Sequence, residues 1–339
     1  MPELSLLVPE LSRCLRFVGE RGKQGEVSRW LGQAKPVVLG HRNLSDGLFQ
    51  LFGYRGADNH PSAAVCCQAL SSDAVGNQAW LALTPARFEA DLTRLVVSEL
   101  PDQGLVAHLP PALICQLQSL LAEYDLGLLH KGSALLAYGD WLSQVSYSMP
   151  ADETLGRNVA DAFPVSSEPL VNRRFKRLFN EMQMLLHAFF QKPGEPFQAR
   201  FNGFWLHGAG RLPTSIPRPA FDQIIADWPL ARALAGLASS RWQALPASLD
   251  NFRFDANHSL MVWYCDHSSR PEQRLRSLTD DCLQPLRRQL ASGRLTRLTV
   301  FAERLGGWML QPSQRWRFWR ARQSLVQAWQ QLEHHADVN

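Results

Sequence analysis

Short apolar runs separated by turn residues dominate the first half of the chain. The runs at 63–70 and 79–83 are bounded by proline, serine, glycine and asparagine, and this punctuation predicts two strands of a hairpin. Thr84-Pro85 then predicts the start of a helix, because threonine caps a helix well and proline fits its first turn. Residues 4–31 have weak helical spacing interrupted by proline and glycine, which predicts a mixture of short helix and loop.

A clearer pattern follows between residues 110 and 169. Leucines spaced for one helical face follow Pro110-Pro111 and predict a helix to about residue 124, and the apolar pieces at 126–145 predict two strands. The composition then turns polar and proline-bearing over 146–169, which is the expected linker. We therefore expect an N-terminal α/β region at 1–165 and a C-terminal α/β region at 166–339, with one continuous domain as the alternative.

The second half opens with the most regular pattern in the chain. From Arg173 onward, apolar residues recur on one helical face and predict a helix that packs against a sheet. An aromatic strand follows at 201–207 and leads into a predicted turn at Gly208-Ala209-Gly210. The later expected elements are a helix at 230–237, a strand at 258–264, a helix at 270–290 kinked at Pro285, a hairpin of strands at 295–301 and 308–310, and a closing helix at 319–334. This succession predicts an α/β fold with a mixed sheet flanked by helices.

Composition places the chain among folded proteins with a sizeable core. It has 339 residues, of which 45% are hydrophobic and 19% charged, and its formal net charge is only +4. The six cysteines include no C-x-x-C pair, which predicts reduced thiols rather than a zinc site or a disulfide framework. The N-terminus lacks the pattern of a secretory signal, and no run of about 18 apolar residues occurs. We therefore expect a cytoplasmic protein with no membrane segment.

Polar residues lie at the border of the central helix and on the strand that follows it. Asn180, Gln183 and His187 are spaced three and four apart, so their side chains can form one polar line. Backbone N–H groups of the glycine turn could hold an anion. The hypothesised ligand site comprises Asn180, His187, Asn202 and His207 as neutral hydrogen-bonding groups and Arg211 as the anion contact. For the helix residues, the alternative is a line of buried polar side chains that orders the helix against its neighbours. For the glycines, the alternative is a tight turn that requires positive φ.

Two segments resemble the bacterial RpfE-type family of regulatory proteins. They are NEMQMLLH at 180–187 and FNGFWLHGAGRLP at 201–213, and the resemblance extends over most of the chain. Members of that family are often labelled phosphoglycerate mutase. The strand and glycine turn are similar to a segment of the archaeal type of cofactor-independent phosphoglycerate mutase, a member of the alkaline phosphatase superfamily. The resemblance therefore implies a C-terminal half like that of the alkaline phosphatase superfamily.

The enzyme that this resemblance implies has specific chemical requirements. A mutase of that superfamily needs two metal ions held by aspartates and histidines, together with a serine or threonine nucleophile. The nearest substitutes are Asp46-Gly47 and Asp266-His267-Ser268, and neither has companion ligands at a convincing spacing. The sequence also has no G-x-S-x-G, H-E-x-x-H or dinucleotide-binding motif. We expect a degenerate scaffold with no catalytic residue, no metal and no cofactor, or with Mn or Zn if the mutase alternative holds.

The C-terminal region is basic. Between Arg270 and Arg322 there are twelve arginines against four acidic residues, and residues 315–322 interleave arginine with aromatic side chains. Such a composition can contact phosphates and stack on bases. A closing helix that buries its tryptophans while its arginines face water is the better explanation, because the whole chain is rich in arginine. The sequence thus predicts a non-catalytic regulatory protein that binds a small anionic ligand or a protein partner. A metal-dependent phosphoglycerate mutase or phosphatase is the first alternative, and a nucleic-acid-associated protein is the second.

Overall fold

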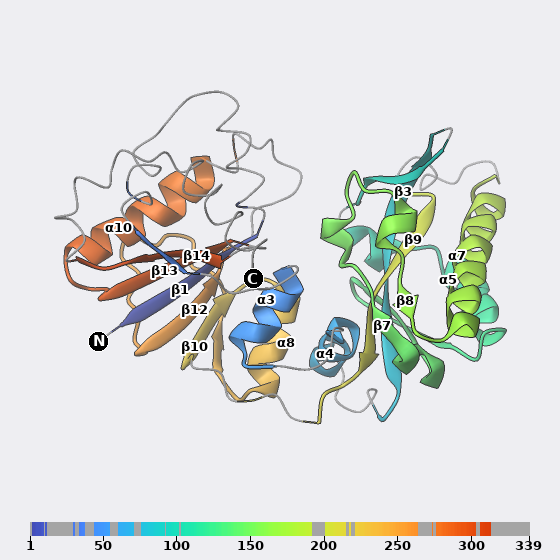
Figure 1. Ribbon diagram of the computed structural model, residues 1–339, viewed down its shortest axis with the longest axis horizontal. Coiled ribbons are helices and arrows are strands. Elements are labelled where there is room, and N and C mark those ends of the chain that lie inside the picture. The colour runs from blue at the N-terminus through green and yellow to red at the C-terminus, as the bar shows by residue number, and fades with distance from the viewer. Residues whose placement is uncertain are drawn as a thin grey trace. The chain divides into compact units, whose positions relative to one another are not determined.

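Both ends of the chain contribute to one folding unit, and the segment between them forms a second. Met1–Tyr54 and Ser215–Asn339 make up the first, here called the split unit, and Arg55–Thr214 make up the second, here called the inserted unit. The computed structural model in Figure 1 describes residues 2–9, 11, 30, 34–37, 44–54, 60–70, 76–91, 93–101, 103–191, 201–214, 217, 221–263, 273, 276–302 and 306–312.

The domain boundary expected between residues 165 and 166 lies inside the inserted unit. Strand β3 (Ala79–Ala90) pairs antiparallel with β9 (Gly203–Arg211), so strands from both sides of that boundary share a sheet. The polar stretch 146–169 is a connection within this unit and carries the short strands β7 (Val145–Tyr147) and β8 (Val165–Ser166). Its prolines and polar residues lie in the connection that leads from β7 to α7 (Pro169–Phe190).

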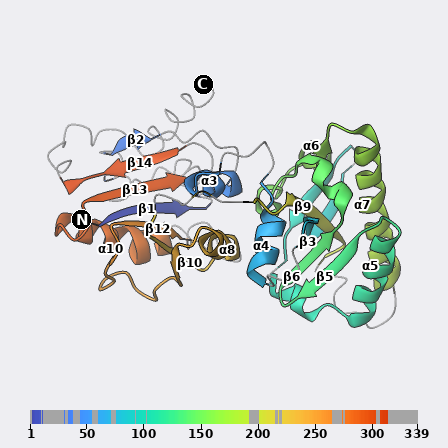
Figure 2. The same ribbon diagram turned by 90° about the horizontal axis from the view of Figure 1, so that it is seen from below.

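A seven-stranded sheet forms the centre of the split unit, in the order β11-β10-β12-β1-β13-β14-β2 (Figure 2). The first five of these strands run parallel, and β14 and β2 are antiparallel to their neighbours. The strands are β1 Glu3–Val8, β2 Lys35–Val37, β10 Gln223–Ala226, β11 Arg241–Gln243, β12 His258–Val262, β13 Arg297–Ala302 and β14 Gly306–Leu310. The mixed sheet, the strand near 258–264 and the hairpin of β13 and β14 confirm the predictions.

Strand β1 corrects the prediction of helix and loop at residues 4–8, and residues 10, 12–29 and 31 of the predicted stretch lie outside the described residues. It lies between β12 and β13, and Leu6 and Leu7 are both fully buried although they are consecutive. Neighbouring side chains point to opposite faces of a strand, so both faces of this one are covered. The run Leu6-Leu7-Val8 is apolar and buried without alternation, so the period of two that marks a half-buried strand is lost in the second half of β1.

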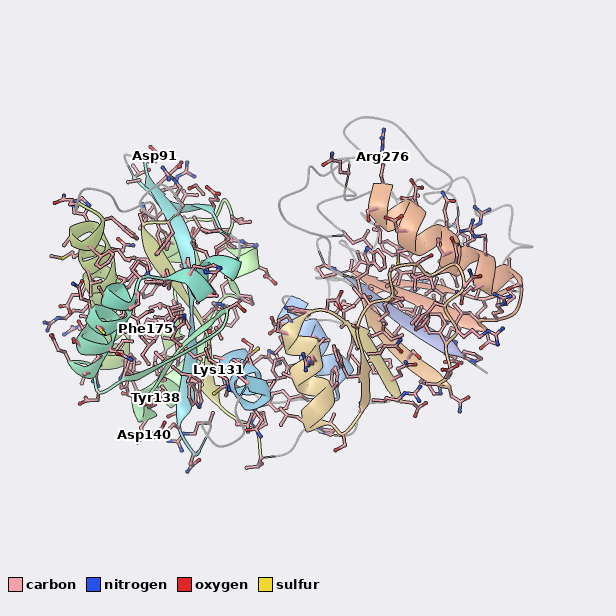
Figure 3. All side chains as sticks on the ribbon, turned by 180° about the vertical axis from the view of Figure 1, so that it is seen from behind. Asp91, Lys131, Tyr138, Asp140, Phe175 and Arg276 are labelled. Atoms are coloured by element: carbon pink, nitrogen blue, oxygen red, sulfur yellow. The ribbon has the colours of Figure 1, made fainter. Side chains whose placement is uncertain are left out.

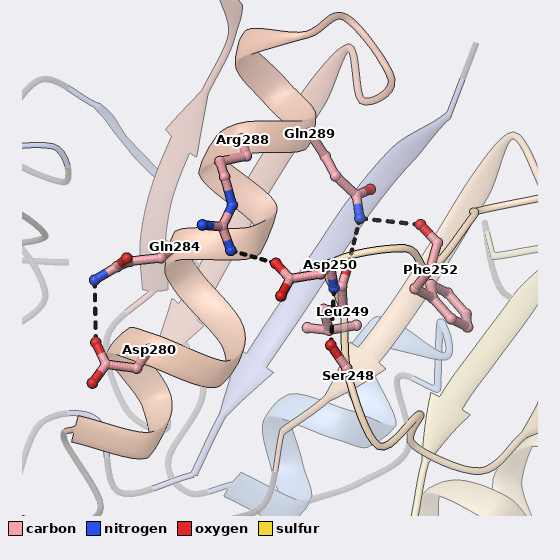
Figure 4. Close-up of polar contacts among 8 residues, drawn as sticks. All are labelled: Ser248, Leu249, Asp250, Phe252, Asp280, Gln284, Arg288 and Gln289. Carbon is pink, nitrogen blue, oxygen red and sulfur yellow. Dashed lines mark hydrogen bonds and ion pairs between the residues drawn. The ribbon is translucent and has the colours of Figure 1, made fainter.

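Among the described residues, the split unit includes the helices α3 (Leu44–Leu51), α8 (Pro229–Leu237) and α10 (Gln284–Ala291). A π-helical turn at Leu278–Leu283 runs directly into α10, so the irregularity expected near Pro285 is present just before that proline. Gln289 of α10 donates from Nε2 to the carbonyl oxygens of Leu249 at 2.8 Å and Phe252 at 3.1 Å (Figure 4). Arg288 also pairs with Asp250, so the irregular segment 248–252 is tied to the helix.

A second sheet forms the centre of the inserted unit. Its strands lie in the order β4-β3-β6-β5, and β9 also pairs with β3. Helices α5 and α7 lie beside each other on one face of the sheet, and α4 lies on the other face (Figures 1 and 2). The remaining bounds are β4 Leu95–Glu99, β5 Gly127–Lys131, β6 Ala134–Tyr138, α4 Ser62–Leu70, α5 Pro111–Ala122, α6 Val159–Ala162 and α7 Pro169–Phe190. Helix α5 and the pair β5 and β6 confirm the sequence prediction.

Two predicted elements of the inserted unit are wrong. Residues 63–70 are not a strand but belong to α4, and Thr84-Pro85 lies inside β3 instead of starting a helix. Proline is tolerated there because β3 pairs with β6 through Ala82 and with β4 only from Arg87 onward. Pro85 therefore lies in the gap between β6 and β4, on the edge of β3 opposite β9, where no neighbouring strand needs an N–H donor.

Helix α7 confirms the most regular pattern of the sequence. Its buried side chains include Phe175, Leu178, Phe179, Met182 and Leu186, as the periodicity predicted. Phe175 points into the interior of the inserted unit (Figure 3), where it makes an edge-to-face contact with Trp141 at a centroid distance of 5.6 Å. No helix in the described part of the chain is long and apolar enough to cross a membrane. The predicted closing helix at 319–334 lies outside the described residues.

Candidate functional site

Asn180 and His187 lie on the exposed surface of α7. Gln191, which follows the helix, donates from Nε2 to Nε2 of His187 at 2.7 Å. Gln183, between them, is half-buried, and its Nε2 has no hydrogen-bond partner among the residues that the structure describes. The polar line of the sequence therefore divides into two exposed residues and one that faces the interior.

Asn202 precedes β9 and completes the hydrogen bonding of β3. The Phe88 N–H donates to Asn202 Oδ1 at 2.7 Å, and Asn202 Nδ2 donates to the Phe88 carbonyl at 2.8 Å. A register shift between Arg87 and Phe88 interrupts the pairing of β3 with β4 at this point. The side-chain amide thus binds both polar groups of the Phe88 backbone, with one hydrogen bond to its oxygen and one from its nitrogen.

His207 lies in β9 and is partly buried. Its Nε2 is 2.9 Å from Oγ1 of Thr84 on the neighbouring strand β3. Burial lowers the pKa of His207 to about 4, so the ring is neutral near pH 7. A general base works best when its pKa is near the working pH, so this histidine is suited to hydrogen bonding rather than to activating the Thr84 hydroxyl.

The turn predicted at Gly208-Ala209-Gly210 is instead part of β9, which continues to Arg211. Gly208 has a φ of +67°, and the pairing of β3 with β9 is irregular opposite it, between Trp80 and Ala82. The backbone N–H groups of Gly208 and Ala209 donate to Ser148 Oγ at 2.8 and 3.3 Å. The two N–H groups considered for an anion are therefore bound to a serine hydroxyl of the same unit.

Arg211 ends β9 and is exposed. Its Nη2 lies 3.4 Å from Oδ1 of Asp140, an exposed residue at the margin of the inserted unit (Figure 3). No hydrogen bond or ion pair joins any two of the five residues Asn180, His187, Asn202, His207 and Arg211. The structure therefore places them on α7, on β9 and just before β9, without bringing them together through polar contacts.

A cavity of about 330 Å³ lies instead at the N-terminal half of α7. It is lined by Glu123, Tyr124, Arg173, Arg174 and Arg177, and we call it the arginine cavity. Tyr124 and Glu123 come directly after α5, and the three arginines share one side of α7 because of their helical spacing. The pairing of α5 with α7 thus brings three guanidinium groups to one hollow of the inserted unit.

Each arginine of the cavity is held differently. Arg174 donates from Nη2 to the carbonyl of Tyr124 and pairs with Asp125 at 2.6 Å, and its guanidinium stacks 4.8 Å from the centre of the Trp141 ring. Arg177 donates from Nε to Oε1 of Glu181 at 2.8 Å. Arg173 is exposed and makes no hydrogen bond or ion pair with any residue within the described ranges.

Tyr124 is the most buried residue of the arginine cavity. Only 6% of it is exposed, and its hydroxyl donates to Glu181 Oε2 at 2.6 Å. Burial, and next the hydrogen bond to Glu181, raise the pKa of Tyr124 to about 12, so the phenol keeps its proton near pH 7. The same hydrogen bonds, from Tyr124 and Arg177, hold the pKa of Glu181 below its usual value.

Sequence reasoning did not select these residues, although a signal was present. The run RRFKR at 173–177 places three arginines at positions that share a helix side, and this run opens the central helix. The contribution of Tyr124 could not be foreseen, because it depends on the packing of α5 against α7, which are more than 40 residues apart along the chain.

The described residues include no group of three or more histidine, cysteine, aspartate or glutamate side chains that could hold a metal ion. Asp46, one of the substitutes considered for a metal ligand, is buried in the first turn of α3 with 5% exposure. Asp266 and His267 lie outside the described residues, and so does the basic aromatic segment 315–322. The metal and nucleic-acid alternatives that depend on those segments stay predictions.

Comparison with known proteins concerns the architecture of the chain. No family model matches the sequence, and no curated protein matches it. The cofactor-independent phosphoglycerate mutase of Thermoplasma acidophilum is similar in structure over 92% of this chain and 90% of its own, at 13% identity and a TM-score of 0.42. The PH0037 protein of Pyrococcus horikoshii is similar over 88% and 81%, at 10% identity and a TM-score of 0.42. This distant likeness concerns the fold, and the resemblance to RpfE-type regulators stays a prediction.

Proposed function

We propose that this chain is a regulatory protein that binds a small anionic ligand, and that the arginine cavity is its binding site. The observation that carries the proposal is the convergence of Arg173, Arg174 and Arg177 on one cavity of about 330 Å³. Guanidinium groups present several N–H donors in a fixed plane, which suits phosphate and carboxylate oxygens. We therefore expect the ligand to carry a phosphate or carboxylate group.

Donors remain available on the cavity arginines. Arg177 uses Nε for Glu181, which leaves the edge formed by its two terminal nitrogens, and Arg173 keeps all its donors within the described part of the chain. Glu123 is the acidic residue of the lining, while Asp125 and Glu181 each pair with one cavity arginine. Because these carboxylates offset much of the positive charge, directional hydrogen bonds rather than net charge would select the anion.

The arginines have a competing structural explanation. Arg174 donates to the Tyr124 carbonyl just beyond the end of α5, and basic side chains often satisfy the last carbonyls of a helix. This explains Arg174, and the pair with Glu181 accounts for Nε of Arg177. It leaves the two terminal nitrogens of Arg177 and the whole guanidinium of Arg173 without a structural role among the described residues. The lining also favours binding over chemistry, since guanidinium groups keep their protons near neutral pH and so does Tyr124.

The five residues of the sequence hypothesis are less suited to the same ligand. Asn202 and His207 are bound to Phe88 and Thr84, and Arg211 is paired with Asp140. Asn180 and His187 are exposed on α7. A ligand at Asn202, His207 or Arg211 would compete with these contacts, whereas a ligand in the arginine cavity would use donors of Arg173 and Arg177 that bind no other described residue.

Calorimetric titration of the full-length protein with inorganic phosphate and with 3-phosphoglycerate tests the proposal. We expect saturable binding that weakens as salt is raised, and at least a tenfold loss of affinity in the double variant Arg173→Gln and Arg177→Gln, because charge-assisted hydrogen bonds contribute about 1.5–3 kcal/mol each. Lys176→Gln is the matched control, because it removes one charge from the same helix without altering the cavity lining.

Three outcomes would contradict the proposal. The site is wrong if no oxyanion binds saturably, or if Lys176→Gln weakens binding as much as the double arginine variant. The non-catalytic role is wrong if the purified protein retains Mn or Zn and interconverts phosphoglycerates, which metal analysis and a phosphotransfer assay measure directly.

A further inference from the structure

We infer that Tyr124 and Glu181 are positioning residues that preset Arg177 for an oxyanion in the arginine cavity. This inference rests on the proposed function and assigns a role to two residues that do not themselves need to touch the ligand. Glu181 lies on α7 outside the cavity lining, and Tyr124 lines the cavity from the end of α5.

The three side chains form one hydrogen-bonded chain. The Tyr124 hydroxyl donates to Oε2 of Glu181 at 2.6 Å, and Nε of Arg177 donates to Oε1 of the same carboxylate at 2.8 Å. Each carboxylate oxygen therefore has its own donor. The Tyr124 ring is buried, so it fixes one end of the chain, and the carboxylate transmits that position to the guanidinium.

The chain determines which donors of Arg177 stay available. The guanidinium is planar and rigid, so holding Nε against Glu181 also fixes the direction of the edge formed by the two terminal nitrogens. That edge can bind two oxygens of a phosphate or carboxylate at once. The side chain of Arg177 is 75% exposed, so without the carboxylate it would sample many rotamers. An anion would then lose binding free energy by fixing one of them.

The protonation states support this assignment. The raised pKa of Tyr124, to about 12, keeps its hydroxyl a donor, and the lowered pKa of Glu181 keeps its carboxylate an acceptor for both partners. A plain ion pair between residues four apart on a helix needs only Arg177 and Glu181. Such a pair does not require the buried Tyr124, which lies just beyond the end of α5.

The inference predicts a specific pattern of phosphate affinity in the full-length protein. Tyr124→Phe and Glu181→Gln should each weaken binding of inorganic phosphate about three- to tenfold, the scale set by the cost of immobilising one long side chain. In an Arg177→Gln background, Tyr124→Phe should have no further effect, because its influence passes through Arg177. Glu89→Gln, an exposed acid-to-amide change on β3 of the same unit, is the matched control and should leave affinity unchanged.

The possible results separate this inference from the proposed function. If the unmodified protein does not bind phosphate, the proposed function fails. If it binds and neither Tyr124→Phe nor Glu181→Gln weakens binding, the positioning role fails and the site stands. Tighter binding by Glu181→Gln would also overturn the role, because the carboxylate would then act by repelling the anion. An equal effect of Tyr124→Phe with and without Arg177 would show that Tyr124 does not act through that arginine.

Discussion

A neutral histidine within a sheet links the stability of the inserted unit to pH. His207 has a pKa lowered to about 4 by burial, whereas an exposed histidine titrates near 6.5. Between these values the unfolded chain takes up a proton that the folded chain excludes, so acid favours unfolding in that window. The stability that the inserted unit gains from neutral His207 is intact above about pH 6.5 and is lost progressively as the pH falls to about 4.

We therefore predict that the free energy of unfolding falls by up to about 1.4 kcal/mol per pH unit between pH 6.5 and 4 on account of this residue. His207→Gln keeps a side-chain acceptor for Thr84 and does not titrate, so its urea midpoint should fall less steeply than that of the unmodified protein. Parallel slopes for the two proteins would show that another group is responsible for the acid sensitivity.

Single residues also show the limit of reading a site from sequence. Asn202 and Arg211 stood out as polar groups near glycines, but each is bound to a residue distant along the chain, Phe88 and Asp140. Such a partner cannot be inferred from local pattern, because it depends on which strands pair. The sequence spacing places Arg173 and Arg177 on the same side of a helix, whereas it gives no sign of Tyr124, which completes their cavity.

At the scale of elements, prediction succeeded where one periodicity dominated. Helix α7 has a long apolar face, and α5 begins at the second of two consecutive prolines, so both could be predicted as helices. Strand β1 and helix α4 failed for a shared reason: both are short apolar runs, in which periodicity does not separate strand from helix. Strand β3 failed at Thr84-Pro85 because proline is acceptable where no neighbouring strand needs its N–H.

The glycines of β9 allow a test at this scale. Gly208 has a φ of +67°, and a Cβ atom built there would lie 2.2 Å from Ser62 Oγ and 3.0 Å from the backbone nitrogen of Ala63, at the start of α4. Gly208→Ala should therefore destabilise the protein by about 2–4 kcal/mol, from strained φ and from the displacement of α4. The measurement is the urea unfolding midpoint.

Gly132→Ala is the matched control for this substitution. Gly132 also has positive φ, at +57°, but nothing lies within 4 Å of a Cβ built there. It should incur only the conformational cost, about 1 kcal/mol. If the two variants lose equal stability, the close packing of α4 against β9 is not what requires glycine at position 208.

At the scale of the whole chain, the inserted unit has its own sheet and its own hydrophobic core. The core draws on β3 and α5 as well as on α7 and β9, and so on both sides of residue 165. The split unit depends in the same way on distant parts, since β1 from the start of the chain lies between β12 and β13 from its second half. A sequence-based boundary placed at a polar, proline-bearing stretch could not detect either pairing, because each joins segments separated by more than 100 residues.

These pairings predict which fragments fold. A fragment of residues 55–214 contains β3 with all its partner strands. Helix α4 near the start of the fragment contacts β9 near its end, so both ends of the fragment pack on the same sheet. We expect this fragment to unfold cooperatively in urea, as seen by circular dichroism of its aromatic bands. Fragments 1–165 and 166–339 should not, because the first lacks β9 and α7 and the second lacks β1. Cooperative unfolding of both of these fragments, with a disordered 55–214, would contradict the division into a split and an inserted unit.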